Sequence, residues 1–514
     1  MPFLPVPVRM KSATLPGGAS RFRRGLLLPG ALAVAVFAAL QVATPHAVGV
    51  DGLFHAKAAE MIRRNLPRPW MPPFTWLDLT SLRQDRFADF HWGFHLLLVP
   101  FTFLGTETAA KVAPVVFASA SFLALYFVLK KIGARYATAW MALALLASPI
   151  FLMRLSQNKA PSVMLGLLVL IAWTVLSRRD LASALLCLAT GWIYPVVPIV
   201  AAVAGASLAG RALAEKRLPV RGAVAVAAGM ALGLLVHPDF PRNLAFAWVN
   251  VTESVTIRAG EYAPLRPADA FENLALPGLV FLLAAGRALT GRAANRPAAL
   301  AFGLQAATMA ALTARYARGI DYLPPFVALF GAVALDEPLD RGLAALRRSG
   351  RARAAAGAAV IAAVAAGAAV WQVHRGRVIV QRNSAPVARR LEAAAHWLEE
   401  HTAPGERVLN LSSGDFEEMW LYDTKNTYFT GLNLNFLKAE SPALYELYGE
   451  VYQRGDMAAL TGLLERTESR YLLASDRLPP PLLKALASTP RFEVVYRDRS
   501  CFIARAATAG DTTP

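Results

Sequence analysis

The stretch "GVDGLFHAKAAEMIRRNLP" (residues 49–67) decides the fold, because the chain changes character there at once. An apolar run of about twenty residues, from Gly25 to Thr44, ends just before it. That is the length of a helix that crosses a bilayer. A carboxylate at the end of such a span is costly to dehydrate and is commonly functional. Asp51 is therefore a candidate general base or substrate anchor at the membrane surface; the alternative is a solvated helix cap.

The composition is that of a membrane protein. Apolar residues make up 55% of the 514 residues, charged residues make up 17%, and the mean hydropathy is +0.40. A soluble domain has about a quarter of its residues charged. In a membrane protein a net charge of +18 is typical of basic cytoplasmic loops, so nucleic acid is not implied as a partner. Cys187 lies in an apolar run and Cys501 in the polar tail, so we expect no disulfide.

Apolar runs predict a polytopic α-helical membrane protein with about 11 transmembrane helices and a C-terminal extracytoplasmic α/β domain. We expect a cytoplasmic N-terminus at 1–24, a transmembrane domain at 25–375 with a long first outer loop at 45–106, and the α/β domain at 376–514. The candidate spans are 25–44, 107–129, 135–152, 161–177, 181–193, 195–210, 221–237, 277–291, 298–314, 320–336 and 354–373.

The basic loops orient these spans. Arginine and lysine gather in the connections at 130–135, 177–180, 210–221, 286–298 and 336–354, which the positive-inside rule places in the cytoplasm. This threading requires "FHWGFHLLLVPFTFLG" (90–105) to lie along the outer surface, and a break at Tyr194–Pro195 to separate two short helices. The first span is then a retained signal anchor in the cytoplasmic (inner) membrane.

The polar tail has the pattern of a small α/β domain. "RVLNL" (407–411) and "RYLLAS" (470–475) are typical of buried strands, and 385–401 and 480–489 of helices. "RFEVVYRD" (491–498) and "CFIARA" (501–506) predict an antiparallel pair. The polar, aromatic stretch "GDFEEMWLYDTKNTY" (414–428) is interpreted either as a substrate-facing loop or as a structured surface loop.

Two histidines four positions apart, His91 and His95, share one helix face. That spacing suits zinc, but a third ligand is required, and Asp89 and Asp85 are candidates for it. The alternative is a polar face on an interfacial helix. We predict no metal and no other cofactor.

Four cations fall in the short loops predicted to lie outside, where the positive-inside rule disfavours them: Arg154, Lys159, Arg315 and Arg318. Guanidinium groups bind phosphate oxygens through paired donors, so a phosphate headgroup is the expected anion. Binding to ordinary lipid headgroups explains them equally well. The other candidate substrate-binding residues are His55, Lys57 and Tyr322, beside His91 and His95.

The order of these elements resembles the C-type superfamily of polytopic glycosyltransferases, which includes oligosaccharyltransferases, protein O-mannosyltransferases and lipid A aminoarabinose transferases. The resemblance rests on the first span, "DGLFHAKAAEMIRRNLP", "FHWGFHLLLVPFTFLG", the chain of spans, "ARYARGIDYLPPF" (314–326) and the α/β tail. It implies a polyprenyl-phosphate-linked sugar donor, a catalytic Asp51, an arginine such as Arg318 on the lipid phosphate, and inversion at the sugar carbon.

The sequence departs from the oligosaccharyltransferase pattern in two places. The second outer loop, "RLSQNKAPS" (154–162), lacks the acidic pair that helps oligosaccharyltransferases hold a metal, and their Trp-Trp-Asp motif is missing from the tail. A metal-free transferase like the mannosyl or aminoarabinosyl branch therefore fits better.

We predict an enzyme that moves a sugar to a glycan, lipid or protein acceptor, in contact with membrane lipid. The rival hypotheses are a transporter or flippase of a lipid-linked sugar or polysaccharide, and an assembly protein whose tail binds a partner.

Overall fold

The structure is a computed structural model that describes residues 18–252, 263–384, 389–489 and 491–506. It forms two compact units. The helical unit contains 1–44, 112–234 and 259–382, and the α/β unit contains 45–111, 235–258 and 383–514. The predicted domain boundaries stay a prediction, but the α/β unit adds two earlier segments to the predicted tail. Residues 1–17 of the predicted cytoplasmic N-terminus and 253–262 of a predicted outer loop lie outside the described residues.

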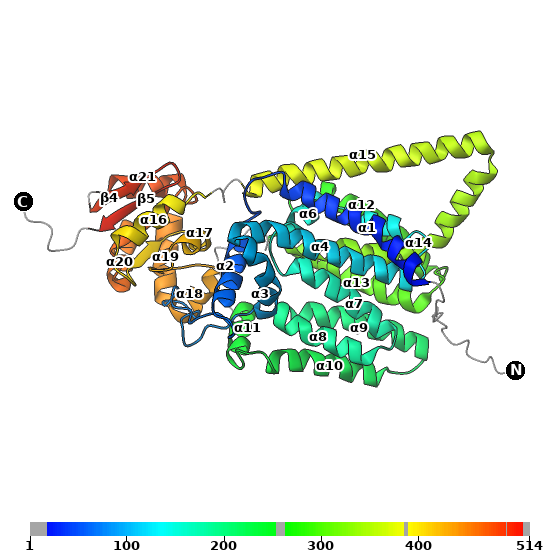
Figure 1. Ribbon diagram of the computed structural model, residues 1–514, viewed down its shortest axis with the longest axis horizontal. Helices are drawn as coiled ribbons and strands as arrows, with labels where there is room; N and C mark the ends of the chain where they lie inside the picture. The colour runs from blue at the N-terminus through cyan, green and yellow to red at the C-terminus, as the bar shows by residue number, and fades with distance from the viewer. Residues whose placement is uncertain (1–17, 253–262, 385–388, 490, 507–514) are drawn as a thin grey trace, which may run out of the picture. The chain divides into compact units, whose positions relative to one another are not determined.

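Each predicted span overlaps a helix or a bent pair of helices of the helical unit (Figure 1). Predicted span 135–152 consists of two helices that meet at a bend of 86°. The elements are α1 (Gly18–Gln41), α4 (Thr106–Lys131, whose first turns belong to the α/β unit), α5 (Ala137–Leu145), α6 (Pro149–Leu155), α7 (Pro161–Leu176), α8 (Asp180–Ile193), α9 (Val197–Glu215), α10 (Val220–Leu235), α12 (Pro267–Leu289), α13 (Arg296–Arg315), η3 (Ala317–Asp321), α14 (Leu323–Arg348) and α15 (Arg351–Ser384).

Five of the described helices, α4, α9, α12, α13 and α15, are long and apolar enough to cross a membrane, and the bent pair α5–α6 makes a sixth candidate. Further apolar helices, among them α7, α8 and α10, are shorter. The helical membrane fold is therefore as predicted, while the count of eleven spans stays a prediction.

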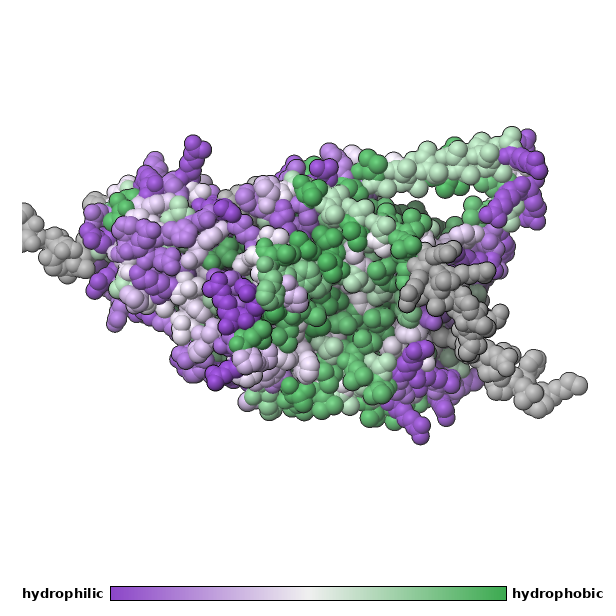
Figure 2. All heavy atoms as spheres, in the orientation of Figure 1, coloured by the Kyte–Doolittle hydropathy of each residue, from purple (hydrophilic) through white to green (hydrophobic). Residues whose placement is uncertain are grey.

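Apolar side chains cover much of the face of the helical unit that Figure 2 shows. Large exposed ones include Val224, Leu279, Leu282 and Val360. In water such a surface would drive association, whereas lipid tails solvate it. Charged residues gather instead at the α9–α10 and α14–α15 loops, which lie at the same end of this unit as the start of α1 (Figures 1 and 2). This placement agrees with the loop charges that oriented the spans.

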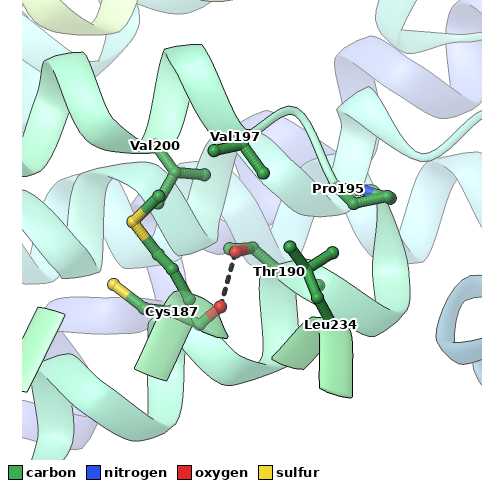
Figure 3. A pocket seen from close by; sticks show the side chains of 8 residues that line it. Cys187, Thr190, Pro195, Val197, Val200 and Leu234 are labelled. Atoms are coloured by element: carbon green, nitrogen blue, oxygen red, sulfur yellow. Dashed lines mark hydrogen bonds between the residues drawn. The ribbon is translucent and has the colours of Figure 1, made fainter. Parts of the chain in front are cut away.

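The predicted break between two short helices is present. α8 ends at Ile193 and α9 begins at Val197, with Pro195 between them. Beside the break lies a small, mostly apolar pocket (Figure 3), in which the Thr190 hydroxyl donates to the Cys187 carbonyl at 2.7 Å. The pocket is lined by Cys187, Thr190, Gly191, Pro195, Val197, Val200, Met230 and Leu234. A Cβ at Gly191 would approach the backbone of Gly233 to 2.7 Å, so this contact of α8 with α10 requires glycine.

The α/β unit contains a five-stranded sheet in the order β2-β1-β3-β5-β4. β1 pairs in parallel with β2 and β3, and β5 pairs antiparallel with β3 and β4. The predicted strands and the antiparallel pair are confirmed. Cys187 in the helical unit and Cys501 in the α/β unit form no disulfide. The strands are β1 (Arg407–Asn410), β2 (Thr427–Tyr428), β3 (Tyr471–Ser475), β4 (Phe492–Arg497) and β5 (Cys501–Ala506). The helices are α2 (Asp51–Arg64), α3 (Trp92–Leu98), η1 (Val99–Leu104), α11 (Arg242–Thr252), α16 (Glu392–His401), η5 (Ser413–Asp415), α17 (Phe416–Tyr422), α18 (Leu434–Glu440), α19 (Pro442–Arg454), α20 (Met457–Thr467) and α21 (Pro480–Ser488).

The sheet has an apolar core on each face, because successive strand residues point to opposite sides. Leu472 belongs to the core with α19–α21, and its neighbour Leu473 to the core with α16 and α17. The core that contains Leu473 also includes α2, whose Phe54 ring stacks on the Trp420 ring with the centroids 5.2 Å apart. The helix that begins at Asp51 is thus held by the core of the α/β unit.

Candidate functional site

Asp51 is the first residue of α2. The N-cap residue of the helix is Val50, whose side chain makes no capping hydrogen bond. Asp51 is therefore not the helix cap of the alternative interpretation. The positive end of the helix dipole favours a carboxylate in this first turn. Asp51 is half-buried, which suits a carboxylate that meets a substrate.

A second carboxyl, Glu417 on α17, faces the charge of Asp51. Burial and the negative charge of Asp51 raise the pKa of Glu417 to about 8. Its side chain is 3% exposed, and its Oε2 meets no hydrogen-bond partner in the described part of the chain. Glu417 is therefore mostly protonated at neutral pH, while a carboxyl with a normal pKa would be ionised.

Two other acids of the stretch 414–428, Asp415 and Glu418, form an arginine cluster with Arg390 and Arg477. Arg390 Nη2 lies 2.7 Å from Asp415 Oδ1, and Arg477 Nη2 lies 2.5 Å from Glu418 Oε1. Both acids are buried, as is Arg390. The stretch 414–428 is thus not a surface loop but a short buried helix with its flanks, because Phe416, Met419 and Trp420 place it in the core.

On the same helix as Asp51, His55 meets the predicted histidine pair. His55 Nδ1 lies 2.9 Å from His95 Nε2, and His95 Nδ1 lies 2.8 Å from Asp89 Oδ2. His91, the residue before α3, is beside them, with its ring centroid 4.8 Å from that of His55. Three of the candidate binding residues therefore come together with Asp89.

The hydrogen bonds of His95 bear on the predicted zinc spacing. Both ring nitrogens of His95 are engaged, one with Asp89 and the other with His55, so neither is oriented toward a metal. Among the described residues, no group of three or more His, Cys, Asp or Glu side chains is placed to hold a metal ion.

Lys57 pairs with an acid of its own helix. Its Nζ lies 3.5 Å from Glu60 Oε2, and that carboxylate also accepts from Thr106 Oγ1 at 3.0 Å. Burial acts to raise the pKa of Glu60, but Lys57, Thr106 and Arg64 outweigh it, so the pKa lies below its usual value. Lys57 thus has a structural partner in addition to its predicted role.

In the helical unit, Arg154 forms a buried ion pair that the sequence did not indicate. It lies in helix α6 rather than in a loop, and its Nη2 donates to Asp321 Oδ2 at 2.9 Å, with a second contact from Nε to Oδ1. Asp321 is 1% exposed. Because Asp321 already neutralises it, we rank Arg154 below the other candidate phosphate ligands.

The other three candidate phosphate ligands, Arg318, Arg315 and Lys159, are more exposed than Arg154. Arg318 is half-buried in η3 and donates from Nη2 to the Tyr194 hydroxyl at 2.7 Å, a neutral partner beside the α8–α9 break. Arg315 is exposed over the ring of Tyr316, and Lys159 is half-buried between α6 and α7. Tyr322 is buried, and its hydroxyl meets no hydrogen-bond partner among the described residues.

Comparisons with known proteins agree with this architecture. No protein-family model matches the chain, and no curated protein sequence does. Among solved structures, the chain is similar to the archaeal oligosaccharyltransferase AglB from Archaeoglobus fulgidus in complex with an inhibitory peptide and a dolichol-phosphate (13% identity, TM-score 0.59, 88% of this chain and 70% of that chain covered). It is also similar to ArnT from Cupriavidus metallidurans bound to undecaprenyl phosphate (17% identity, TM-score 0.57, 96% and 99% covered). The chain therefore shares the fold of these solved structures.

Sequence reasoning missed the roles of three residues that neighbour candidate residues within their own unit. Glu417 stood in a quoted stretch but had no assigned role, Asp321 was read as part of a loop, and Tyr194 was named only for the helix break. Asp89 was considered only as a metal ligand. No local pattern marks Glu417, Asp321 and Tyr194, because each is brought to its neighbour by packing of segments far apart in sequence. Asp89 is only six positions from His95, but its contact with that side chain depends on how the loop before α3 folds.

Proposed function

We propose that this protein is an integral membrane glycosyltransferase that moves a sugar from a polyprenyl-phosphate-type donor to an acceptor on the outer face of the membrane, with inversion at the anomeric carbon. The observation that carries the proposal is the likeness over most of the chain to two proteins solved with dolichol-phosphate and undecaprenyl phosphate. Asp51 in the first turn of α2 supplies the base that such a reaction needs.

In this reaction Asp51 takes the proton of the acceptor hydroxyl while the oxygen attacks the anomeric carbon. The bond from that carbon to the phosphate oxygen breaks, and the lipid phosphate leaves with the bonding electrons. Arg318 stabilises the phosphate charge, with Arg315 and Lys159 as the alternative cations, and this interaction is strongest where water is scarce. The chain's own residues supply these roles, and we assign no metal or cofactor to them.

The experiment that tests the function uses purified protein in lipid nanodiscs with undecaprenyl phosphate carrying a radiolabelled hexose or pentose. With cell-envelope extract as the acceptor source, a transferase releases undecaprenyl phosphate and passes the label to an acceptor. Asp51→Asn is the inactive control. If the label stays on the lipid with every sugar, the transferase proposal is wrong. Movement of intact donor across proteoliposomes would then favour a flippase.

The proposed topology places the protein in the inner membrane with the α/β unit outside. A cysteine introduced at exposed Arg499, between β4 and β5, should react with an impermeant thiol reagent in spheroplasts with a permeable outer layer. The native Cys187 and Cys501 are buried and give a low background. Labelling that occurs only after lysis would contradict the proposed orientation.

A further inference from the structure

Three buried side chains of the α/β unit form one hydrogen-bonded chain that ends on the helix of Asp51. Asp89 Oδ2, His95 Nδ1, His95 Nε2 and His55 Nδ1 follow one another, with contacts of 2.8 and 2.9 Å. Asp89, His95 and His55 are 5%, 1% and 7% exposed. Since His55 is four positions after Asp51 on α2, the two side chains share one face of the helix, a turn apart.

The charge on Asp89 sets the direction of the chain. Burial acts to raise the pKa of Asp89, but His95 and His91 outweigh it and hold the pKa below its usual value. The His91 backbone N–H donates to Asp89 Oδ1 at 3.2 Å, and the Asp89 N–H itself donates to Asp239 Oδ2 at 2.8 Å. Asp89 is therefore ionised at neutral pH, and an ionised carboxylate can only accept hydrogen bonds.

The tautomers follow from this direction. His95 must carry a hydrogen on Nδ1 to donate to Asp89, so the Nε2 of a neutral His95 is an acceptor. His55 must then carry its hydrogen on Nδ1 to donate to His95. As a result, Nε2 of a neutral His55 carries no hydrogen and is the proton-accepting end of the chain.

We infer that His55, His95 and Asp89 form a proton relay that removes the acceptor's proton from Asp51 after sugar transfer. The inference rests on the proposed function. Asp51 passes the proton to His55 Nε2, the hydrogen on His55 Nδ1 moves to His95 Nε2, and His95 becomes an imidazolium held by the Asp89 carboxylate. Asp51 loses the proton and returns to its ionised form, His55 gains one proton at Nε2 and loses one at Nδ1, and His95 holds the net proton. After the products leave, the proton returns through His55 and is released to water from half-buried Asp51. His95 and Asp89 thus act through His55.

The second acid beside Asp51 does not compete for this proton. Glu417 already holds a proton at neutral pH, because burial and Asp51 raise its pKa to about 8.

The relay also has a structural alternative, in which the histidines only fill the space between α2 and α3. The two interpretations predict different kinetics and different tautomers.

The kinetic test compares His55→Gln, His95→Asn and Asp89→Asn with His396→Gln, whose histidine is exposed on α16 and outside the relay. With a saturating undecaprenyl-phosphate-linked sugar, kcat of the relay variants should fall by about 10²-fold while KM stays within about twofold. Imidazole in the buffer should restore part of the kcat of His55→Gly. A structural role predicts instead a lower melting temperature, with kcat of the folded fraction unchanged and no rescue.

A spectroscopic test needs no variant that might fail to fold. In wild-type protein with ¹⁵N-labelled histidine at pH 8, NMR should show the Nδ1–H tautomer for both His55 and His95. An Nε2–H tautomer at either residue overturns the relay, as does a kcat within twofold of wild type in all three variants. If wild type and His396→Gln release no undecaprenyl phosphate, the proposed function fails. If they are active and the relay variants are equally active, only the relay fails.

Discussion

Glu417 and Glu418 are neighbours on α17, yet their carboxyls meet opposite kinds of charge. Glu418 lies in the arginine cluster, where Arg477 donates to it at 2.5 Å, whereas Glu417 faces the acid Asp51. Burial acts to raise the pKa of both glutamates; the arginines oppose it at Glu418, and Asp51 adds to it at Glu417. A buried acid that is matched by cations stabilises a fold only weakly, while one beside a like charge is a candidate for chemistry. One face of α17 is thus structural and the other faces the candidate site.

The largest effect is expected at Asp51. Asp51→Asn keeps the size of the side chain and one acceptor oxygen but removes the base, so turnover should fall by about two to four orders of magnitude. Thermal stability should change little, and undecaprenyl phosphate should still bind. Release of undecaprenyl phosphate from the labelled donor measures the effect. Turnover within a few-fold of wild type would reject the catalytic role and leave Asp51 as a helix-terminal residue.

Arg390→Ala removes one of the two cations of the arginine cluster that surrounds Glu418. This variant leaves Asp415 and Glu418 buried with one cation fewer, which should destabilise the α/β unit by about 3–5 kcal/mol. Unfolding monitored by tryptophan fluorescence measures the loss. Arg491→Ala, which removes an exposed ion pair with Glu465, is the control and should cost less than about 1 kcal/mol. Equal losses of unfolding free energy in the two variants would show that the arginine cluster does not stabilise the α/β unit more than an exposed ion pair does.

A similar contrast separates two arginines of the helical unit. Arg318→Ala should weaken binding of undecaprenyl phosphate by about 10- to 150-fold, because charge-assisted hydrogen bonds of roughly 1.5–3 kcal/mol are lost. Folding should be nearly unaffected, since its partner Tyr194 is neutral. Arg154→Ala should mainly lower stability, because it leaves Asp321 buried and unmatched.

Two outcomes would change this assignment. If affinity is unchanged in Arg318→Ala but lost in Lys159→Ala, the lysine is the phosphate ligand. If neither variant binds more weakly than wild type, the outer cations serve ordinary lipid headgroups. Binding is measured by titration of detergent-solubilised protein with undecaprenyl phosphate.

The smallest effect is a pH dependence of stability. The pKa of Glu417 is about 8 in the native protein and near the usual 4.5 in the unfolded chain, so the unfolded chain releases this proton first as pH rises. Its contribution to stability is full below about pH 4.5 and is lost as pH rises to about 8. Glu417→Gln should therefore flatten the fall of Tm between pH 5 and 8 by a few degrees.

The matched control for this titration is Glu400→Gln, which changes an exposed glutamate of α16. Its Tm should follow that of wild type at every pH. A Glu417→Gln profile that runs parallel to wild type from pH 5 to 8 would show that Glu417 is ionised in the native protein, contrary to its position beside Asp51.

The sequence by itself determined the features that depend on local pattern. Spans appear as apolar runs because a helix must be long enough to cross the hydrocarbon layer, and Pro195 marks a break because it lacks a backbone donor. β1, β3, β4 and β5 were predictable from short apolar runs between turns, and Asp51 stood out because an acid follows a span without a spacer.

Only the tertiary structure decided which charges are matched. Arg154 meets Asp321 across 167 positions, His55 meets His95 across 40, and Asp51 faces Glu417 from a segment near the other end of the chain. The physical reason is that a charge is shifted or neutralised by what lies within a few ångströms of it, and apolar packing sets those neighbours. Phe54 on Trp420 brings α17 to α2, so a core contact determines which acid faces Asp51.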